Sequence, residues 1–284
     1  MVCIIQEDEI SYNTELLDLR NDFVFRSFFI SANYLLIDFL NTILDFKIIK
    51  ADIINSGLEI IHSDDKFSRL VLKVETENGE RINIEIQLQI HEAFPERILM
   101  YWAKMYATQD KKGKYSKELN KAIQIIITDF KLLPKSNYYS KFLIIDGEDG
   151  TVFSEHLQLY VLELSKLDVN RLDQTNKLEK WLLFLKADKK TKEALALESS
   201  LMKDALDEIE RISQDPKTVE IASSREFFLK DQLQREVDAL NRGREEGKEE
   251  VIFPMYELGI SVRKIANVTG FSIEKVERVI EHKF

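Results

Sequence analysis

The chain has 284 residues, of which 44% are hydrophobic and 32% are charged, and its formal net charge is −10. Such a composition predicts a globular protein of one large domain or two unequal ones, and no apolar run approaches the roughly 20 residues of a membrane span. The acidic balance argues against a general polyanion binder, because a nucleic-acid function would require a local basic surface.

Cys3 is the single cysteine of the chain. One cysteine can form neither an internal disulfide nor a zinc site, and the first ten residues lack the basic start of a signal peptide. We therefore expect a cytoplasmic protein with no membrane partner.

The first predicted elements are helices. Residues 1–17 are polar and are expected to be frayed, and a first helix is expected to begin near Asn21 or Asp22, since either side chain can cap it. A second helix follows over residues 33–44, and a strand is expected over residues 53–62. The helical side chains expected to be buried are Phe23, Phe25, Phe28, Phe29, Leu35, Leu36, Phe39, Leu40 and Ile43.

The next two predicted elements are strands joined by a turn. In residues 69–76 the even positions Leu70, Leu72 and Val74 are apolar, and the odd positions are polar with Val71 as the exception. Residues 81–90 alternate strictly, with Glu85 and Gln87 on the polar side. Because successive side chains of a strand point to opposite faces, the pattern predicts a β-hairpin with one apolar face and one polar face.

The turn limits how these two strands can pair. Directly opposed residues share a face, so odd positions must oppose odd positions, and a two-residue loop would mix the faces. A three-residue loop over residues 77–79 matches the faces and puts Gly79 where a left-handed backbone is favoured. A five-residue loop is the alternative. The three-residue loop sets Val71 opposite Glu85.

Helix and strand alternate after this hairpin. Pro95 begins a helix that is expected to end at Gly113. The nearly continuous apolar run over residues 122–130 predicts a buried central strand. A second hairpin over residues 141–153 and a further strand over residues 156–164 complete the pattern. Strands between helices predict an α/β or α+β core.

The composition becomes leucine-rich, alanine-rich and charged after the last predicted strand, so an all-α extension is expected. Its last part contains two short helices capped by Ser261 and Ser272, with Gly270 in the turn between them. This pair resembles a helix-turn-helix, and a packing or oligomerisation module is the alternative. The predicted divisions are a frayed N-terminus at 1–17, an α/β core at 18–187, a charged helical extension at 188–250 and a small C-terminal module at 251–284.

Several blocks of sequence occur in an order that resembles one protein family. The blocks are DLRNDFVFRSFF, LLIDFLNTIL, GERINIEIQ, ERILMYWAKMY and GKYSKELNKAIQIIITDF. Over about residues 17–165 they resemble the Rpn family of recombination-promoting nucleases and transposases, a branch of the PD-(D/E)XK nuclease superfamily. The resemblance implies a restriction-endonuclease-like core with a mixed central sheet flanked by helices. It also implies metal-dependent cleavage of DNA, with Mg²⁺ or Mn²⁺ as the cofactor.

The motif of that family has an aspartate on the first hairpin strand and Glu-x-Gln on the second. Glu85-Ile86-Gln87 matches the second half, which implies Glu85 as a metal ligand and Gln87 as a residue that orients water. The aspartate position falls on Val71, which is also the apolar exception on the polar face. Loss of this carboxylate should weaken Mg²⁺ binding severely, unless Asp64 or Asp65 substitutes for it.

Other candidate site residues each have an ordinary alternative. Asp22 could be a further acidic ligand or a plain helix cap, and Arg97 could contact a phosphate or lie on an ordinary helix surface. The densest basic stretch could follow a DNA backbone or could simply be solvated. Its lysines are Lys104, Lys111, Lys112, Lys114, Lys117 and Lys121.

Together these features predict a metal-dependent DNA endonuclease that is impaired by Val71, either as a degenerate inactive copy or as a natural or engineered variant of the catalytic site. DNA and a second copy of the chain are the expected partners. The alternatives are an inactive relative that binds DNA or a protein, and an accessory protein with no nucleic-acid role, which the net charge favours.

Overall fold

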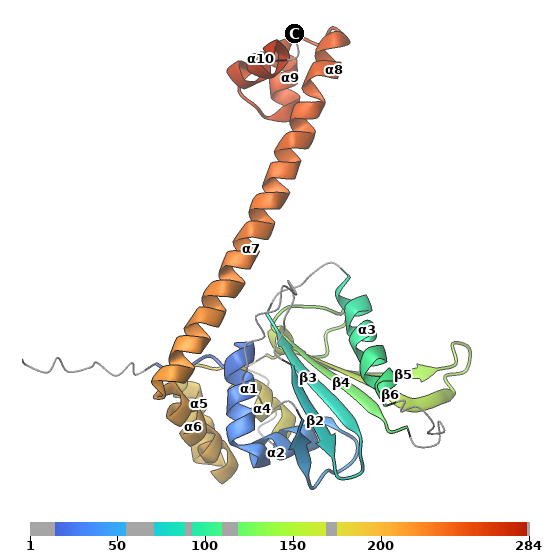
Figure 1. The fold of residues 1–284 in the computed structure, drawn as a ribbon, viewed down its shortest axis with the longest axis vertical. Coiled ribbons are helices and arrows are strands. Elements are labelled where there is room, and N and C mark those ends of the chain that lie inside the picture. The colour runs from blue at the N-terminus through green and yellow to red at the C-terminus, as the bar shows by residue number, and fades with distance from the viewer. Residues whose placement is uncertain (1–14, 55–70, 89–92, 110–118, 169–174, 283–284) are drawn as a thin grey trace, which may run out of the picture. The chain divides into compact units, whose positions relative to one another are not determined.

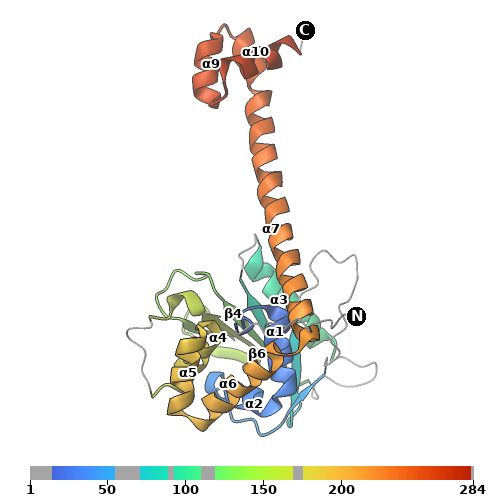
Figure 2. The ribbon, with the colours of Figure 1, turned by 90° about the vertical axis from the view of Figure 1, so that its left-hand side faces the viewer.

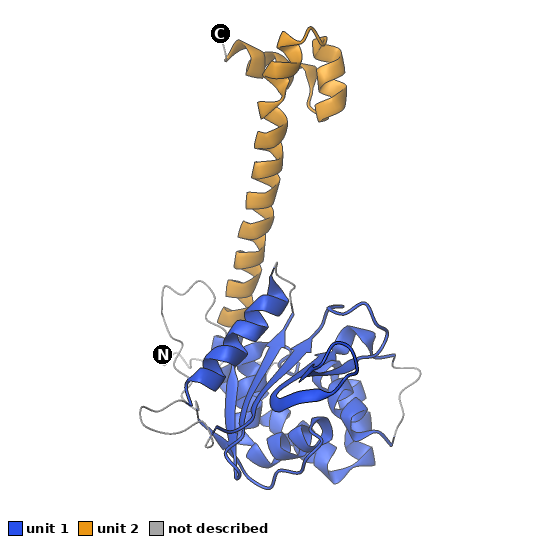
Figure 3. Ribbon diagram, turned by 90° about the vertical axis from the view of Figure 1, so that its right-hand side faces the viewer, with its two compact units in different colours: residues 1–223 blue, residues 224–284 orange. Residues whose placement is uncertain are grey.

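The computed structural model describes residues 15–54, 71–88, 93–109, 119–168 and 175–282. The chain forms two compact units, residues 1–223 and residues 224–284 (Figure 3). The central sheet and the predicted hairpin belong to the first unit, and the predicted C-terminal module belongs to the second.

A mixed six-stranded sheet lies at the centre of the first unit (Figure 1). Its three inner strands β3, β4 and β6 are parallel, and the strands outside them pair antiparallel. A mixed sheet flanked by helices confirms the predicted fold class. In spatial order the strands are β1 (Ala51–Ile53), β2 (Leu72–Thr76), β3 (Arg81–Gln87), β4 (Ala122–Thr128), β6 (Val152–Glu163) and β5 (Tyr139–Ile145).

Two strand predictions need correction. The predicted second hairpin and the strand after it share one element, because β6 continues without a break from Val152 to Glu163. The strand β1 covers Ala51–Ile53 and so ends where the strand expected over residues 53–62 should begin, and residues 55–62 lie outside the described residues. The predicted central strand is confirmed as β4, whose residues are all buried.

Three helices cover one face of the sheet (Figure 2). They are α1 (Asp22–Ser31), α2 (Asn33–Ile43) and α4 (Lys177–Lys186). The side chain of Asn21 caps α1, since its Oδ1 accepts hydrogen bonds from the N–H groups of Phe23 and Val24. The apolar residues predicted to be buried are at most 2% exposed: Phe23, Phe25, Phe28, Phe29, Leu35, Leu36, Phe39, Leu40 and Ile43.

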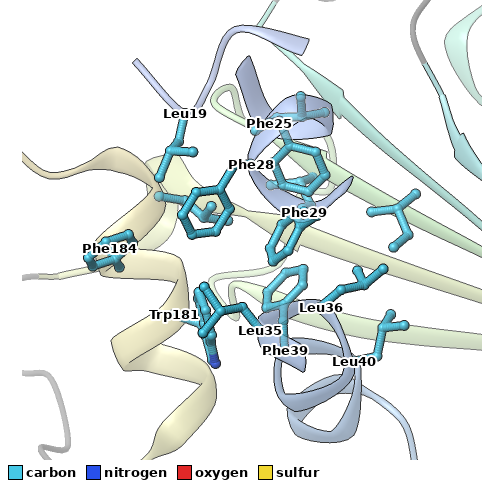
Figure 4. Close-up of a cluster of buried hydrophobic side chains, with 14 of the residues drawn as sticks. Leu19, Phe25, Phe28, Phe29, Leu35, Leu36, Phe39, Leu40, Trp181 and Phe184 are labelled. Atoms are coloured by element: carbon cyan, nitrogen blue, oxygen red, sulfur yellow. The ribbon is translucent and has the colours of Figure 1, made fainter. Parts of the chain in front are cut away.

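Aromatic rings fill the space where these helices meet (Figure 4). The ring centroid of Phe29 lies 5.4 Å from that of Phe39 and 6.1 Å from that of Trp181. The Trp181 indole N–H donates to Asp38 Oδ2 at 2.8 Å, so the tryptophan buries its ring while its one polar atom is satisfied. This cluster ties α1 and α2 to α4, which lies far away in the sequence.

The opposite face of the sheet is covered by α3 (Phe94–Ala107) (Figure 1). Phe94 and Ile98 pack against Ile126 of β4, and the Trp102 indole N–H donates to the carbonyl oxygen of the first residue of β4 at 2.8 Å. The N-terminal half of α3 therefore lies over the C-terminal half of β4. The helix ends at Ala107, earlier than the predicted end at Gly113, which lies outside the described residues.

Two further helices, α5 (Lys189–Glu198) and α6 (Ser200–Ser213), pack into the core of the first unit. Buried side chains such as Leu195 and Ile209 join the same apolar cluster as α1 and α2. The packed unit consequently extends to Ser223, beyond the core boundary expected at residue 187. Most residues of α5 and α6 are polar or charged, so their composition alone does not indicate that a narrow apolar stripe packs into the core. A short 3₁₀ helix, Leu164–Lys166, follows β6.

The helix α7 (Pro216–Glu250) is continuous, so the charged stretch over residues 242–250 is helical. Three short helices follow it and enclose a small apolar core. Ser272 caps the last of them by accepting a hydrogen bond from Lys275 N, whereas the side chain of Ser261 makes no capping hydrogen bond. These helices are α8 (Ile252–Glu257), α9 (Val262–Thr269) and α10 (Ile273–Glu281).

No single helix in the described part of the chain is long and apolar enough to span a membrane. The helices α1 and α2 satisfy that criterion only as a pair, which is bent by 110°. Their apolar side chains belong to the core described above.

The hairpin β2–β3 has the register predicted for the three-residue loop. Lys73 lies opposite Asn83, so the five-residue alternative is wrong. The Thr76 N–H donates to Glu80 O, and the Gly79 N–H donates to Thr76 O, each at 3.0 Å. Gly79 has φ +86°, the left-handed conformation that the turn requires.

Replacement of Gly79 by alanine should therefore destabilise the hairpin. We expect Gly79→Ala to lower the free energy of unfolding by about 1–2 kcal/mol, because a Cβ atom is unfavourable at positive φ. The new Cβ would also contact the side-chain amide of Asn120, which can rotate away. Gly147→Ala is the control, since nothing lies within 4 Å of its Cβ position. Equal losses in urea unfolding of the two variants would contradict the turn geometry.

Lys192 on α5 is a buried cation in this core, with 3% of its surface exposed. Its Nζ donates to the carbonyl oxygen of Ala187 and lies 5.5 Å from the ring centroid of Phe184. Removal from water disfavours the charged form, so burial lowers the pKa of Lys192 to about 8 from its ordinary 10.5.

This lowered pKa predicts how stability depends on pH. Between pH 8 and 10.5 the unfolded chain binds more protons than the folded chain, so the contribution of Lys192 to stability should rise with pH across that window. Below pH 8 both states are protonated and the full burial penalty persists. Lys192→Met should raise the free energy of unfolding at pH 7 by roughly 1–3 kcal/mol. Chemical denaturation of the unaltered chain and of Lys192→Met from pH 7 to 10 measures both effects. If the free energy of unfolding changed with pH in the same way for the two proteins, the prediction would be refuted.

Candidate active site

The strand β3 presents different chemistry to the two faces of the sheet. Ile82, Ile84 and Ile86 point into the core under α1 and α2. The alternate residues lie on the face covered by α3, where Asn83 and Glu85 are buried and Gln87 is half-buried. Glu85 and Gln87 therefore share one face, as the alternation predicts.

Val71 lies on that same face. It directly precedes β2, and the register that pairs Leu72 with Ile84 places Val71 opposite Glu85 when it is continued by one residue. Opposed residues of an antiparallel pair share a face and have Cβ atoms about 5 Å apart. The position where the family resemblance implies an aspartate thus adjoins Glu85, and a valine occupies it.

The N-terminal half of α3 encloses this part of the sheet. Glu85 neighbours Ile126 of the parallel strand β4, and Ile126 packs against Phe94 and Ile98. Only 2% of the surface of Glu85 is exposed. A carboxylate at this depth lies largely beyond the reach of bulk water, whereas Gln87 at the end of the strand is half-exposed to solvent.

The C-terminal end of β3 is tied to the start of the chain. The Asp129 N–H donates to Gln87 O at 3.2 Å, and the Asp129 carboxylate accepts from Arg20 at 2.8 Å. Arg20 also binds Asp18, and these hydrogen bonds raise the pKa of its guanidinium. Asp22 follows in the first turn of α1, where its negative charge interacts favourably with the positive end of the helix dipole. It is not the cap, because Asn21 fills that role.

The contact between Arg20 and Asp129 was not predicted from the sequence. They are 109 positions apart, and nothing in the local pattern around either one indicates the other. The pairing arises because parallel strands end at one edge of the sheet, where the segment before α1 also passes. The one local indication was Asp129 itself, a charged residue placed directly after the apolar strand β4.

The basic residues proposed for DNA binding are only partly described. Arg97 is half-buried on α3, with its guanidinium carbon 5.3 Å from the ring centroid of Phe94, and Lys104 is exposed on the same helix. Lys121 forms an ion pair with Glu155 at 2.8 Å. Four predicted lysines lie outside the described residues: Lys111, Lys112, Lys114 and Lys117.

The donor set around Glu85 does not match the needs of a magnesium site. Mg²⁺ binds near-octahedral oxygen ligands and takes carboxylates from the protein. No group of three histidine, cysteine, aspartate or glutamate side chains within the described ranges could hold a metal ion. The side chain of Val71 offers no oxygen at the position opposite Glu85. Asp64 and Asp65, which could substitute for it, lie outside the described residues.

Comparison with known proteins places the chain in a family context. A family model described as a PD-(D/E)XK nuclease family transposase matches residues 19–238. The match covers most of the chain, including the hairpin, all the strands and the helices up to the middle of α7. No curated protein and no solved structure matches the chain.

Proposed function

The chain belongs to the PD-(D/E)XK nuclease family transposases, and on that premise we propose that it is a DNA-binding member whose hydrolytic site is incomplete at Val71. Nucleases of this superfamily generally use divalent metal ions, and their substrate is DNA. The observation that carries the proposal is the hairpin register, which puts a valine beside Glu85 in place of a second carboxylate.

The chemistry of metal binding supports this proposal. A hard dication is held by several oxygen ligands, and a site with a single carboxylate binds it far more weakly than a site with two. The isopropyl side chain of Val71 supplies no oxygen and makes the wall of the site apolar.

The other candidate residues of the site could contribute to DNA binding without hydrolysis. In this proposal Gln87 offers an amide at the solvent-facing end of the strand, and Asp22 lies in the first turn of α1. Lys104 provides exposed positive charge on α3, which covers the same face. Binding to DNA would then depend on local lysines against a repulsive net charge of −10, so it should weaken strongly with salt.

A second candidate is an active endonuclease. The observation that favours it is that Glu85 and Gln87 are both retained on one face of β3. Many other polar residue types would serve a solvated strand equally well, so their retention favours a role in catalysis. In that case Asp64 or Asp65, which precede the hairpin in the sequence, would supply the second carboxylate.

Restoring the carboxylate separates the two candidates. We expect the natural sequence to leave supercoiled plasmid intact in Mg²⁺ or Mn²⁺, while Val71→Asp nicks it at least roughly a hundredfold faster, because metal-derived stabilisation is worth several kcal/mol. Val71→Asn is the matched control, because asparagine has nearly the same size as aspartate and carries no charge. The double variant Val71→Asp/Glu85→Ala should be inactive again.

The other outcomes are equally informative. Cleavage by the natural sequence that Glu85→Ala abolishes would establish the active-endonuclease candidate and reject the incomplete site. Fluorescence anisotropy with labelled duplex DNA at low salt measures the binding part of the proposal. If none of the proteins cuts or binds DNA there, the chain has lost both activities of its family.

A further inference from the structure

The segment before α1 forms a closed turn around Arg20. The Arg20 N–H donates to Asp18 Oδ1 at 2.9 Å, and the Asn21 N–H donates to Asp18 O at 3.0 Å. The Arg20 side chain binds the same carboxylate, with Nε and Nη2 donating to Asp18 Oδ2 at 3.0 Å and 2.7 Å. One aspartate therefore fixes both the backbone and the side chain of Arg20, so the guanidinium has a defined direction.

Asn21 fixes the position of this turn against the helices. Its Oδ1 caps α1, and its Nδ2 donates to Ala222 O at 3.2 Å. Asn21 is 9% exposed and Ala222 is 3% exposed, so this contact is buried. The first turn of α1, which carries Asp22, is therefore held on its inner side by polar contacts that water does not reach.

The far side of the guanidinium reaches the central sheet. Arg20 Nη1 donates to Asp129 Oδ2 at 2.8 Å, and Asp129 directly follows β4. The Asp129 N–H donates in turn to Gln87 O at 3.2 Å, which adds one hydrogen bond to the pairing of β3 with β4 beyond Thr128. One ion pair and one backbone hydrogen bond thus connect Arg20 to the last residue of β3.

The chemistry of these contacts favours a firm link. Both acceptors of the Arg20 side chain are carboxylates, and hydrogen bonds between ionised groups are shorter and stronger than neutral ones. Hydrogen bonding to Asp18 raises the pKa of the guanidinium more than burial lowers it, so the charge persists at neutral pH. Arginine suits this place because its planar fork can bind two carboxylates at once, whereas a lysine ammonium is a single point charge.

We propose that Arg20 is a positioning residue of the candidate site: its guanidinium holds the first turn of α1, which carries Asp22, against the end of β3, which carries Gln87. This role rests on the proposed function, in which both of those side chains belong to the site. The side chains of Arg20 and Asp129 are 35% and 23% exposed, and partly exposed ion pairs contribute little to stability. Small displacements of site residues lower reaction rates strongly, so the link should affect rate more than folding.

Amide hydrogen exchange of the natural chain tests whether the link exists. Arg20→Gln should accelerate exchange of the Asp129 N–H at least roughly tenfold, because the segment after β4 then opens more often. The N–H of Ile126, in the middle of β4, should keep its rate. Arg211→Gln is the matched control, since it removes another arginine–carboxylate pair, with Glu208, and should leave the Asp129 N–H unchanged.

Plasmid nicking in the Val71→Asp background tests whether the link serves the site. Adding Arg20→Gln should lower the single-turnover rate at saturating protein at least roughly tenfold, while the Kd for duplex DNA changes less than about threefold. Arg20→Lys should give an intermediate rate, because one of the two carboxylates can still be bound. A side chain needed only for folding would lower stability without this split between rate and affinity.

Asp129→Asn breaks the same ion pair from its other side and keeps the backbone N–H. It should slow nicking by Val71→Asp as much as Arg20→Gln does. The variant with both substitutions should be no slower than either single one, because residues that share one interaction do not have additive effects. Thermal unfolding checks that each variant is folded.

Three results would overturn the proposal. Unchanged exchange of the Asp129 N–H in Arg20→Gln would show that the link does not hold the strand end. Full-rate nicking by Val71→Asp/Arg20→Gln would show that the link does not serve the site, and additive losses would show that Arg20 and Asp129 act separately. A Val71→Asp chain that neither cuts nor binds DNA would instead reject the proposed function, and the role of Arg20 with it, whatever the exchange of Asp129 shows.

Discussion

The chemistry of this protein depends on the alternation of side chains along β3 and on the turn that fixes its register. A shift of one residue would move Glu85 from the face under α3 into the aliphatic core. The three-residue loop with Gly79 at φ +86° prevents this shift by matching odd positions with odd positions. Val71, Glu85 and Gln87 lie on one face of the hairpin because of that constraint.

The neighbours of Glu85 on the face covered by α3 determine the environment of its carboxylate. Parallel pairing places β4 beside β3, so the aliphatic Ile126 and the helix α3 above it enclose one side of Glu85. The antiparallel partner on the other side contributes Val71. Glu85 is thus placed between two apolar neighbours. A second carboxylate at residue 71 would change both the charge and the hydration of this position, which is why one substitution is expected to have a large effect.

Local pattern was sufficient for the parts of the fold that short segments determine. The strict alternation of residues 81–90 and the position of Gly79 gave the hairpin and its register. The spacing of Phe25, Phe29 and Phe39 gave the buried faces of two helices. The family resemblance rested on the same blocks and agrees with the family that matches residues 19–238.

Long-range contacts were beyond the reach of such patterns. The pairing of Arg20 with Asp129 and the contact of Phe39 with Trp181 join segments more than a hundred residues apart. The helices α5 and α6 belong to the core although their composition is mostly charged, because a narrow buried stripe suffices for packing. The helix α3 ends at Ala107, and the next N–H to bond backwards, that of Gln109, donates to Tyr106 O in a tighter i→i−3 turn that no longer continues the α-helix.

The central claim is that the nuclease site lacks one metal carboxylate, and a direct measurement of metal binding tests it most simply. Calorimetric titration with Mn²⁺ should give no saturable binding to the natural sequence that depends on Glu85. Val71→Asp should bind about one ion per chain, and Val71→Asp/Glu85→Ala should lose that binding. Stoichiometric Mn²⁺ binding by the natural sequence that Glu85→Ala removes would contradict the claim, because the site would then be complete without an aspartate at residue 71.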